Sequence, residues 1–351
     1  MSFKQFDPQD IVVSADSLTG TAWSNNQPQL TKFFTSSVQG ASQTGYYYLH
    51  VYQTKSTDTT SAVQFDITYG DLNGSGSLQY NPLVVGSTPT KSIYGQYRNL
   101  ILADENAQFV FGGVTSSHFY ALSIERSKYK EQLALGTMTL KLSGAVGSSA
   151  AQKIRYLTDN SKIQGSTVFC DAGRVFQLVS GSAGTVYTGL NSNGYTNQSG
   201  SYGLVLPDIG VILLNGRALS GSATATNGLC GLNFKRQLNQ NNNIPFALFK
   251  AISGSSAYKG NFKLNSQETV TADYIFCRAR NSEFNFSSNP SFISGSTGAV
   301  LFDNFVYNPQ TFITTVGMYN TNNELLAVAK LSRPLLKDFT KELLIRVKLD
   351  F

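Results

Sequence analysis

The sequence predicts an all-β fold, specifically a multi-domain, β-sandwich-like scaffold with few short helices. Tyr and Phe are abundant, with 18 and 23 residues, whereas charged residues make up only 14% of the 351-residue chain. Ser, Thr, Asn, Gln and Gly are frequent, and this mixture favours short strands joined by tight turns over long helices. Several segments also alternate apolar and polar residues with period two, which is the pattern of a half-buried strand.

We expect four segments along the chain. Residues 1–45 form an N-terminal arm with little structure of its own, because only short apolar runs interrupt its polar residues. Residues 46–145 form the first part of a β domain. Residues 146–235, in which Asn-Gly turn signals recur, form a turn-rich β module that is inserted in this domain or appended to it. Residues 236–351 form a C-terminal β domain, either separate or completing the 46–145 domain.

The strands of the first half are predicted from alternation and from β-favouring residues. In AVQFDITYG, Phe65, Ile67 and Tyr69 alternate with polar residues, which predicts a half-buried strand. Further strands are predicted in GYYYLHVYQT, AQFVFGG, SHFYALSIE and TMTLKLSG. Residues 94–105 fit a short helix or a loop that crosses the sheet.

Short apolar stretches between turn signals predict the remaining strands. They read TVFCDA, RVFQLVSG, TVYTGL, YGLVLP, DIGVILLNG, FALFKAI, NFKLNS, VTADYIFCRAR and AVLFDNFVY. FITTVGMY and LLAVAKL flank a polar turn and predict a β-hairpin. The chain ends in LLIRVKLDF, where Ile345, Val347 and Leu349 alternate with mostly charged residues. Because a terminus frays unless it is tied into a sheet, we expect this strand to pair on at least one side.

The residue types that most catalytic and metal sites require are scarce. His50 and His118 are the two histidines, and each lies within a predicted strand, so Ser-His-Asp and Cys-His arrangements are not indicated. Cys170, Cys230 and Cys277 lack the close pairing of a zinc site. Gly-rich stretches lack the Lys-Ser/Thr pair of a phosphate-binding loop. The sequence therefore predicts no enzyme activity, no cofactor and no metal.

Charge and hydropathy exclude two further classes. The net charge is +6, but the basic residues are scattered along the chain and acids accompany them. A nucleic-acid-binding protein concentrates Lys and Arg on one element, so nucleic-acid binding is not predicted. The N-terminal residues do not resemble a secretion signal, and no apolar run approaches the roughly 18 residues of a membrane span. We expect synthesis in a reducing cytoplasm, consistent with the odd number of cysteines, and no membrane insertion.

Clustered aromatic residues are the candidate partner-binding sites. The candidates are Trp23, Phe33, Phe34, Phe284, Phe286 and Phe292. The first three lie in the predicted arm, and the last three lie in the stretch FNFSSNPSF. Aromatic side chains are strong anchors at protein interfaces, and alternation along a strand would place Phe284 and Phe286 on one face. The competing interpretation is that all six are core residues.

Four stretches, together roughly a third of the chain, carry a resemblance to a known family. They read FKQFDPQDIVVSADSLTGTAWS, SGSYGLVLPDIGVILLNGRAL, DYIFCRARNSEFNFSSNPSF and NPQTFITTVGMYNTNNELLAVAKLSRPLLKDFTKELLIRVKLDF. They resemble virion structural proteins of contractile-tailed, T4-like phages (myoviruses) of marine and cyanobacterial type, and among these the baseplate wedge subunits. The hairpin in the last stretch is also similar to hairpins in phage tail-fibre attachment domains.

The resemblance implies a mainly β virion protein that has no cofactor and binds other baseplate or tail proteins. We accordingly expect a structural subunit that acts through protein–protein assembly and forms a homo-oligomer within a symmetric complex. The alternative is a receptor- or carbohydrate-binding protein associated with the tail fibres, which exposed Tyr and Trp in loops would favour. A tail-associated glycan hydrolase and a capsid or neck protein are the remaining alternatives.

Overall fold

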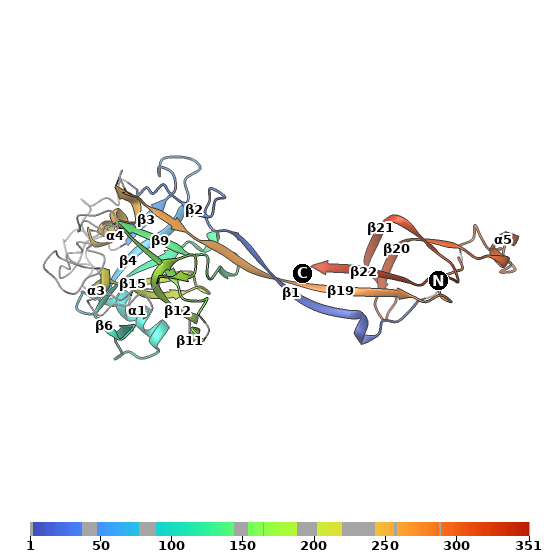
Figure 1. Cartoon of the computed structure of the whole chain (residues 1–351), viewed down its shortest axis with the longest axis horizontal. Helices are drawn as coiled ribbons and strands as arrows, with labels where there is room; N and C mark the ends of the chain where they lie inside the picture. Colours follow the sequence, from blue (N-terminus) through green and yellow to red (C-terminus); the bar gives the residue numbers. More distant parts are fainter. Residues whose placement is uncertain are drawn as a thin grey trace. The chain divides into compact units, whose positions relative to one another are not determined.

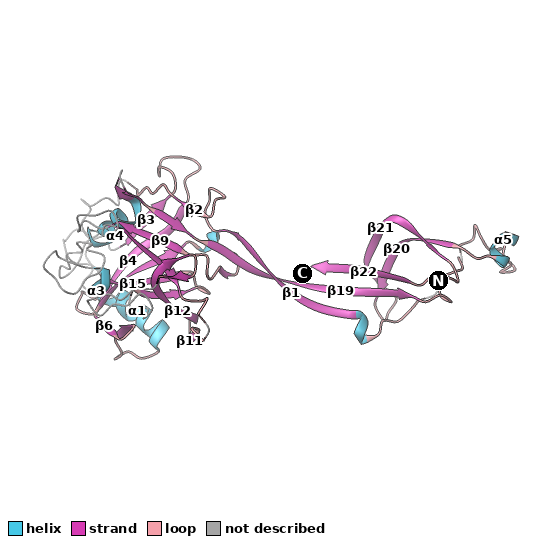
Figure 2. Cartoon of the chain, viewed as in Figure 1, coloured by secondary structure: helices cyan, strands magenta, loops and turns pink. Residues whose placement is uncertain are grey.

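The computed structural model describes the residues 3–36, 48–76, 89–143, 154–163, 165–187, 202–219, 243–255, 258–287 and 289–350. Strands dominate this part of the chain and helices are few and short (Figure 2), so the predicted all-β class is confirmed. The chain divides into two compact units. Unit 1 comprises Met1–Ser17 and Thr269–Phe351, and unit 2 comprises Leu18–Glu268.

Unit 2 contains one antiparallel sheet of twelve strands (Figure 1). Its main path runs, in spatial order, through β2 (Gln29–Leu30), β18 (Asn261–Lys263), β9 (Thr139–Ser143), β10 (Ile154–Asp159), β12 (Gly173–Ser182), β14 (Gly203–Leu206), β15 (Val211–Asn215), β7 (His118–Ile124), β4 (Val63–Asp71) and β3 (Tyr48–Tyr52). Two short strands pair with β12 beside this path: β11 (Val168–Cys170) and β13 (Thr185–Val186).

This sheet curls until its two ends meet. Phe34 follows β2 at one end of the path, and Tyr52 lies in β3 at the other end. These two residues exchange backbone hydrogen bonds with N···O distances of 2.9 and 2.8 Å. Inside, the Trp23 ring lies 6.2 Å from Phe65 of β4 and 5.0 Å from Phe262 of β18. Strands from opposite ends of the path therefore share one core, and the closure leaves fewer unpaired strand edges.

Helix α4 (Asn243–Ser253) packs against strands at both ends of the path, β9 and β18 as well as β3 and β4. The segment FALFKAI within it was predicted to be a strand, and this prediction is wrong. Ile244, Leu248, Ala251 and Ile252 are buried, with the spacing of one helical face. A short apolar run does not distinguish a buried strand from a buried helix, so only the contacts with the curled sheet decide the outcome.

A second hydrophobic core lies between the sheet and helix α1 (Thr90–Leu102). For residues 94–105 the sequence predicted either a short helix or a loop, and the helix is confirmed. The ring of Tyr94 lies 5.5 Å from Phe109 and 5.4 Å from Phe119, and all three are buried. Phe109 belongs to a small hairpin formed by β5 (Phe109–Phe111) and β6 (Val114–Ser116). The sheet is thus covered on this side as well.

Minor elements complete unit 2. They are the 3₁₀ helix Arg126–Lys128, β8 (Gln132–Leu133), α3 (Gly216–Leu219), and the strand pair β16 (Gly254–Ser255) and β17 (Tyr258–Lys259). Strand β8 pairs with the first residues of β19 (Asn265–Ala279), at Ser266 and Gln267.

The segment boundaries predicted at 45, 145 and 235 differ from those of the structure. Strands β10, β12, β14 and β15, all from the predicted 146–235 module, lie between β9 and β7 in the same sheet. All five residues of β15 are buried, as in a strand covered on both faces. This segment is therefore part of the large sheet and not a separate module. Residues 1–45 are likewise divided between the two units, and Ile11–Thr21 forms strand β1.

Unit 1 has two β layers. One is a sheet in the order β1-β19-β22, and the other is the hairpin β20-β21. The bounds are β22 (Leu343–Asp350), β20 (Thr311–Tyr319) and β21 (Leu325–Lys337). A 3₁₀ helix, Pro8–Asp10, precedes β1, and helix α5 (Asp303–Tyr307) precedes β20. The hairpin was predicted correctly, whereas AVLFDNFVY, which contains α5, was wrongly predicted to be a strand.

The core of unit 1 is small. It consists of Ile275, Met318 and Val347, one residue each from β19, β20 and β22. The C-terminal strand pairs with β19 from Leu343 to Asp350, so the prediction that this strand is paired is confirmed. Its odd-numbered residues are buried or half-buried and its even-numbered residues are exposed, as the alternation predicted.

We predict that Trp23→Ala destabilises unit 2, because the cavity would lie where strands from both ends of the sheet share a core. Removing a buried aromatic side chain costs about 3–5 kcal/mol. Urea unfolding followed by circular dichroism would measure this change. The exposed Phe169, changed to Ala, is the control and should change the free energy of unfolding by less than about 0.5 kcal/mol. A Trp23→Ala variant as stable as this control would contradict the role of Trp23.

Candidate functional site

Unit 1 contains a groove of about 840 Å³, and every residue that lines it belongs to this unit. Residues 3–6 form one wall, and the end of β19, the loop after it and strand β20 form the others. Apolar side chains contribute much of the lining: Phe3, Phe6, Phe284, Phe286, Val316 and Met318. The volume is in the range of sites that bind small molecules or several side chains.

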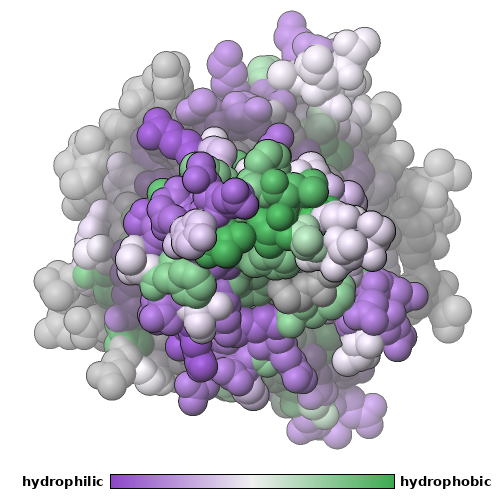
Figure 3. All heavy atoms as spheres, turned by 90° about the vertical axis from the view of Figure 1, so that its right-hand side faces the viewer, coloured by the Kyte–Doolittle hydropathy of each residue, from purple (hydrophilic) through white to green (hydrophobic). Residues whose placement is uncertain are grey.

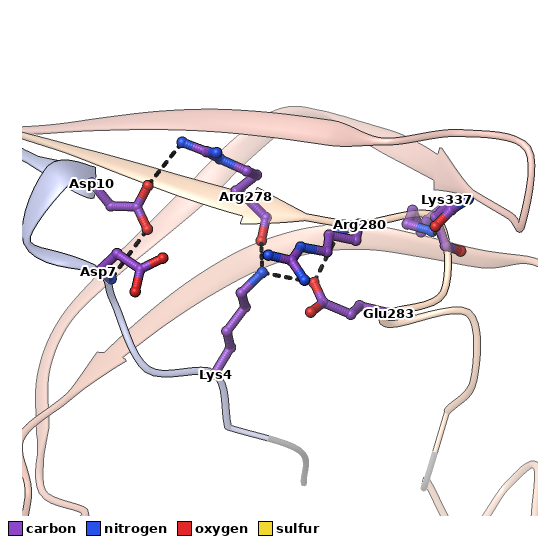
Figure 4. A network of polar contacts seen from close by, with 8 residues as sticks. Lys4, Asp7, Asp10, Arg278, Arg280, Glu283 and Lys337 are labelled. Atoms are coloured by element: carbon purple, nitrogen blue, oxygen red, sulfur yellow. Dashed lines mark hydrogen bonds and ion pairs between the residues drawn. The ribbon is translucent and has the colours of Figure 1, made fainter.

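Polar contacts hold the N-terminal wall in place (Figure 4). The Lys4 Nζ donates to the carbonyl oxygen of Arg278 at 2.9 Å and pairs with the Glu283 carboxylate at 2.8 Å. The Arg278 guanidinium in turn binds Asp10 at 3.1 Å. The hydrogen bond from Lys4, followed by that from the Arg280 backbone N–H, lowers the pKa of Glu283. The charges of these residues therefore position the backbone of the N-terminal wall against β19 and the loop after it.

The loop after β19 is pinned by a buried lysine. Lys337 is 0% exposed. Its Nζ donates to the Asn281 carbonyl oxygen at 2.9 Å, to Asn285 Oδ1 at 2.6 Å and to the Asp338 carbonyl oxygen at 2.9 Å. All three ammonium protons have acceptors, which is the condition for keeping a buried charge. The lysine at the end of β21 thus sets the position of the loop.

Phe284 and Phe286 lie in this loop and not on a strand. Phe284 has a φ of 55°, a left-handed conformation that is uncommon for a non-glycine residue. Its carbonyl oxygen accepts a 2.5 Å hydrogen bond from Thr311 Oγ1 at the start of β20. The prediction that strand alternation places the two rings on one face is therefore wrong, yet both rings line the groove, and Phe286 remains 54% exposed.

The surface of unit 1 is unusually apolar outside the groove as well. Among the described residues, most large hydrophobic side chains that are exposed belong to unit 1, although it is the smaller unit. They include Leu326 and Val328 on the hairpin and Phe302, Val306 and Tyr307 around α5. Figure 3 views the molecule from the side of α5 and shows a hydrophobic patch bordered by polar residues. Large patches of this kind mark interaction sites.

The structure divides the six predicted anchors into two sets. Trp23 is 2% exposed and lies in the core of unit 2, so its assignment as an anchor is wrong. Phe33 is half-buried against the same core, and Phe34 is half-buried and pairs with Tyr52. These three are core and closure residues, the competing interpretation given for them.

The second set lies in unit 1. Phe284 and Phe286 are brought together at the groove. Phe292 lies apart from them and packs on Phe302 and Phe305, with ring centroids 6.2 and 5.1 Å away. The FNFSSNPSF stretch therefore supplies two separate aromatic surfaces.

Sequence reasoning missed the N-terminal wall and the β20 side of the groove. Phe3 and Phe6 flank Lys4 in the stretch FKQF, a pair of aromatic residues in a polar terminus that could have been noticed. The ring of Phe3 contacts Tyr319 of β20 at 5.2 Å in an edge-to-face arrangement. No signal in the sequence pairs residue 3 with residue 319, because this contact arises only when β20 packs in unit 1.

Two features bear on the chemistry of the described residues, the metal-ligating side chains and the thiol of Cys277. In the part of the chain that the structure describes, no cluster of three or more His, Cys, Asp or Glu residues is placed to hold a metal ion, and no helix is long and apolar enough to cross a membrane. Cys277 lines the groove, where burial, and to a lesser degree the Asp10 carboxylate, raises the pKa of its thiol. Such a thiol is a weaker nucleophile at neutral pH than an ordinary cysteine.

Comparison with protein-family models, curated proteins and solved structures finds no match for this chain.

We predict that Lys337→Met loosens the loop that carries Phe284 and Phe286. The substitution keeps the length of the side chain but leaves the acceptors on Asn281 and Asn285 without their ammonium partner, at a cost of about 1–3 kcal/mol. Hydrogen exchange of the amides of residues 280–287 should become faster.

The matched control is Lys341→Met, since Lys341 is exposed and pairs with Asp338 at 3.4 Å. In this control variant, the amides of residues 280–287 should exchange as in the wild type. Unchanged exchange in Lys337→Met would show that the buried lysine does not hold the loop.

Proposed function

We propose that this chain is a structural subunit of a contractile phage tail, most simply a baseplate wedge component, and that it acts by binding other protein subunits through unit 1. The observation that carries the proposal is the hydrophobic surface of unit 1. Monomeric proteins rarely expose contiguous apolar patches of more than a few hundred Å². An exposed surface rich in Phe, Tyr, Leu and Val is suited to burial against a partner.

The location of the family resemblance supports the same proposal. Of the four stretches that resemble wedge subunits, those at residues 273–292 and 308–351 lie in unit 1, and the stretch at residues 3–24 begins there. The resemblance is thus concentrated in the unit that carries the groove and the apolar surface.

The closed sheet of unit 2 is suited to a scaffold. Its strands are hydrogen-bonded along the whole path, and its ends are joined through Phe34 and Tyr52. A strand in such a sheet cannot move without breaking hydrogen bonds on both sides. Unit 2 would therefore keep its own geometry within an assembly, a role that needs no catalytic residues, no cofactor and no metal.

We predict that polar substitutions on the hairpin of unit 1 impair assembly. In a phage that carries this chain, with its own copy of the gene disrupted, plasmid-borne wild-type chain should restore infectious particles. Leu326→Ser with Val328→Ser should lower the yield about tenfold or more, since losing an interface anchor costs about 2 kcal/mol.

The matched control is Phe169→Ser in unit 2, because Phe169 is exposed to nearly the same extent as Leu326, 74% against 69%. This control should restore the wild-type yield. Immunogold labelling should place the wild-type chain at the baseplate, and labelling of the head would overturn the proposal.

A second candidate function, binding of a carbohydrate receptor, rests on one surface of unit 2. Tyr48, His50 and Tyr52 lie in a row on β3, with ring centroids 5.0 and 6.3 Å apart. His50 Nδ1 lies 2.5 Å from the carboxylate of Asp66 on β4, and burial raises the pKa of this carboxylate. Aromatic rings beside a polar pair are the kind of groups that fix a small polar ligand.

This second candidate makes its own prediction. If it holds, the wild-type chain binds glycans on an array, and Tyr48→Ala with Tyr52→Ala lowers the signal about tenfold, the loss expected when stacking of about 1.4 kcal/mol is removed. Tyr187→Ala, at an exposed tyrosine of unit 2 outside this row, is the control and should bind like the wild type. Absence of glycan binding by the wild-type chain would remove this candidate.

A further inference from the structure

Residues 289–310, here called the α5 segment, form an exposed apolar surface. Phe292 packs on Phe302 and Phe305, which gives the segment a small aromatic cluster of its own. None of its residues is buried, and Tyr307 is 88% exposed. Phe302 and Val306 are also exposed. This cluster is too small to bury its own rings. Inserting them into a second surface would therefore gain the free energy of burying apolar area.

The groove of unit 1 offers such a surface. It is lined by aromatic rings, among them Phe3 and Phe286, and by the aliphatic side chains of Ile313 and Val316. Its volume of about 840 Å³ can hold several side chains. No residue of the α5 segment lines the groove of its own chain. The exposed cluster and the open groove are therefore separate and chemically matched.

The charges at the two surfaces allow one further ion pair. The α5 segment contains one charged residue, Asp303, which is exposed. The charged residues that line the groove are Lys4, Arg278 and Asp10, and both cations have acidic partners, Lys4 in Glu283 and Arg278 in Asp10. The Arg278 side chain is 59% exposed despite its contact with Asp10. An interface that brings Asp303 towards Arg278 would pair opposite charges at its rim.

The charge of each unit indicates which kind of partner fits. Unit 1 contains nine Lys and Arg residues and ten Asp and Glu residues, whereas unit 2 contains eighteen and eleven. The positive charge of the chain thus resides in unit 2. Two copies of unit 1 would meet without net repulsion, whereas two copies of unit 2 would repel each other. Charge therefore opposes a contact between two copies of unit 2 and does not oppose a contact between two copies of unit 1.

We propose that the groove of one chain binds the α5 segment of a second copy. This inference rests on the proposed function in that unit 1 is the assembly module, and it names the partner. The contact joins two different patches, so a pair joined by one contact keeps a free α5 segment on one chain and a free groove on the other. Contacts of this type close into rings or continue as filaments.

Two variants test this arrangement with the full-length chain. In the segment variant, Val306→Ser and Tyr307→Ser remove the exposed apolar groups. In the groove variant, Phe3→Ser and Phe286→Ser remove two exposed rings. All four positions are exposed, so the fold should be kept. Each variant alone should associate about 100-fold more weakly than the wild type, because each loses two anchors.

Mixing the two variants is the decisive step. The segment variant keeps an intact groove and the groove variant keeps an intact α5 segment, so one contact can form and dimers are expected by sedimentation velocity. Phe169→Ser in unit 2 should associate like the wild type. The proposal is overturned if the mixture stays monomeric, or if either variant alone associates like the wild type.

Cys277 supplies an independent readout, because it lines the groove. In the mixture, alkylation of Cys277 should slow in the segment variant, whose groove is filled, and stay unchanged in the groove variant. Cys170, in unit 2, is the internal control. Equal protection in both variants would contradict the proposed contact.

This test is separate from that of the proposed function. A wild-type chain that is monomeric at all concentrations, yet restores infectious particles and is labelled at the baseplate, would overturn the self-contact alone. A chain that self-associates as described but is absent from the tail would overturn the proposed function alone.

Discussion

The pairing of Phe34 with Tyr52 joins the two ends of the sheet in unit 2, and the rest of that unit depends on this closure. It brings β18 and β4 close enough for Phe262 and Phe65 to share a core with Trp23. It also leaves a space lined by strands from both ends of the path, which helix α4 fills. Backbone hydrogen bonds and apolar burial are thus satisfied by the same closure.

Unit 1 buries its apolar side chains less completely than unit 2. Its buried hydrophobic cluster contains three of the described residues, and a buried lysine and an N-terminal ion-pair network hold its loops. Its apolar surface remains largely in water. A domain of this kind gains stability from any partner that binds only its folded form. The sparse core and the exposed surface are the two observations behind the proposal that unit 1 assembles with other subunits.

Part of the candidate site could be predicted from the sequence. Phe284 and Phe286 stood out as clustered aromatic residues, and both line the groove, although a loop and not a strand presents them. Trp23 stood out for the same reason and is buried. Local sequence does not separate the two outcomes, because the burial of Trp23 depends on Phe65 and Phe262, which are far away in the chain. The same holds for Phe3, whose contact Tyr319 lies at the other end of the sequence.

The sequence by itself determined the all-β class, the C-terminal hairpin and the paired last strand. Each follows from period-two alternation and turn residues, which are local properties. The tertiary structure alone decided that residues 146–235 complete the large sheet, that FALFKAI is a helix and that the two ends of the chain meet in unit 1. These outcomes depend on which strands pair and on which surfaces are left to cover, and such long-range contacts leave no periodic signature in the sequence.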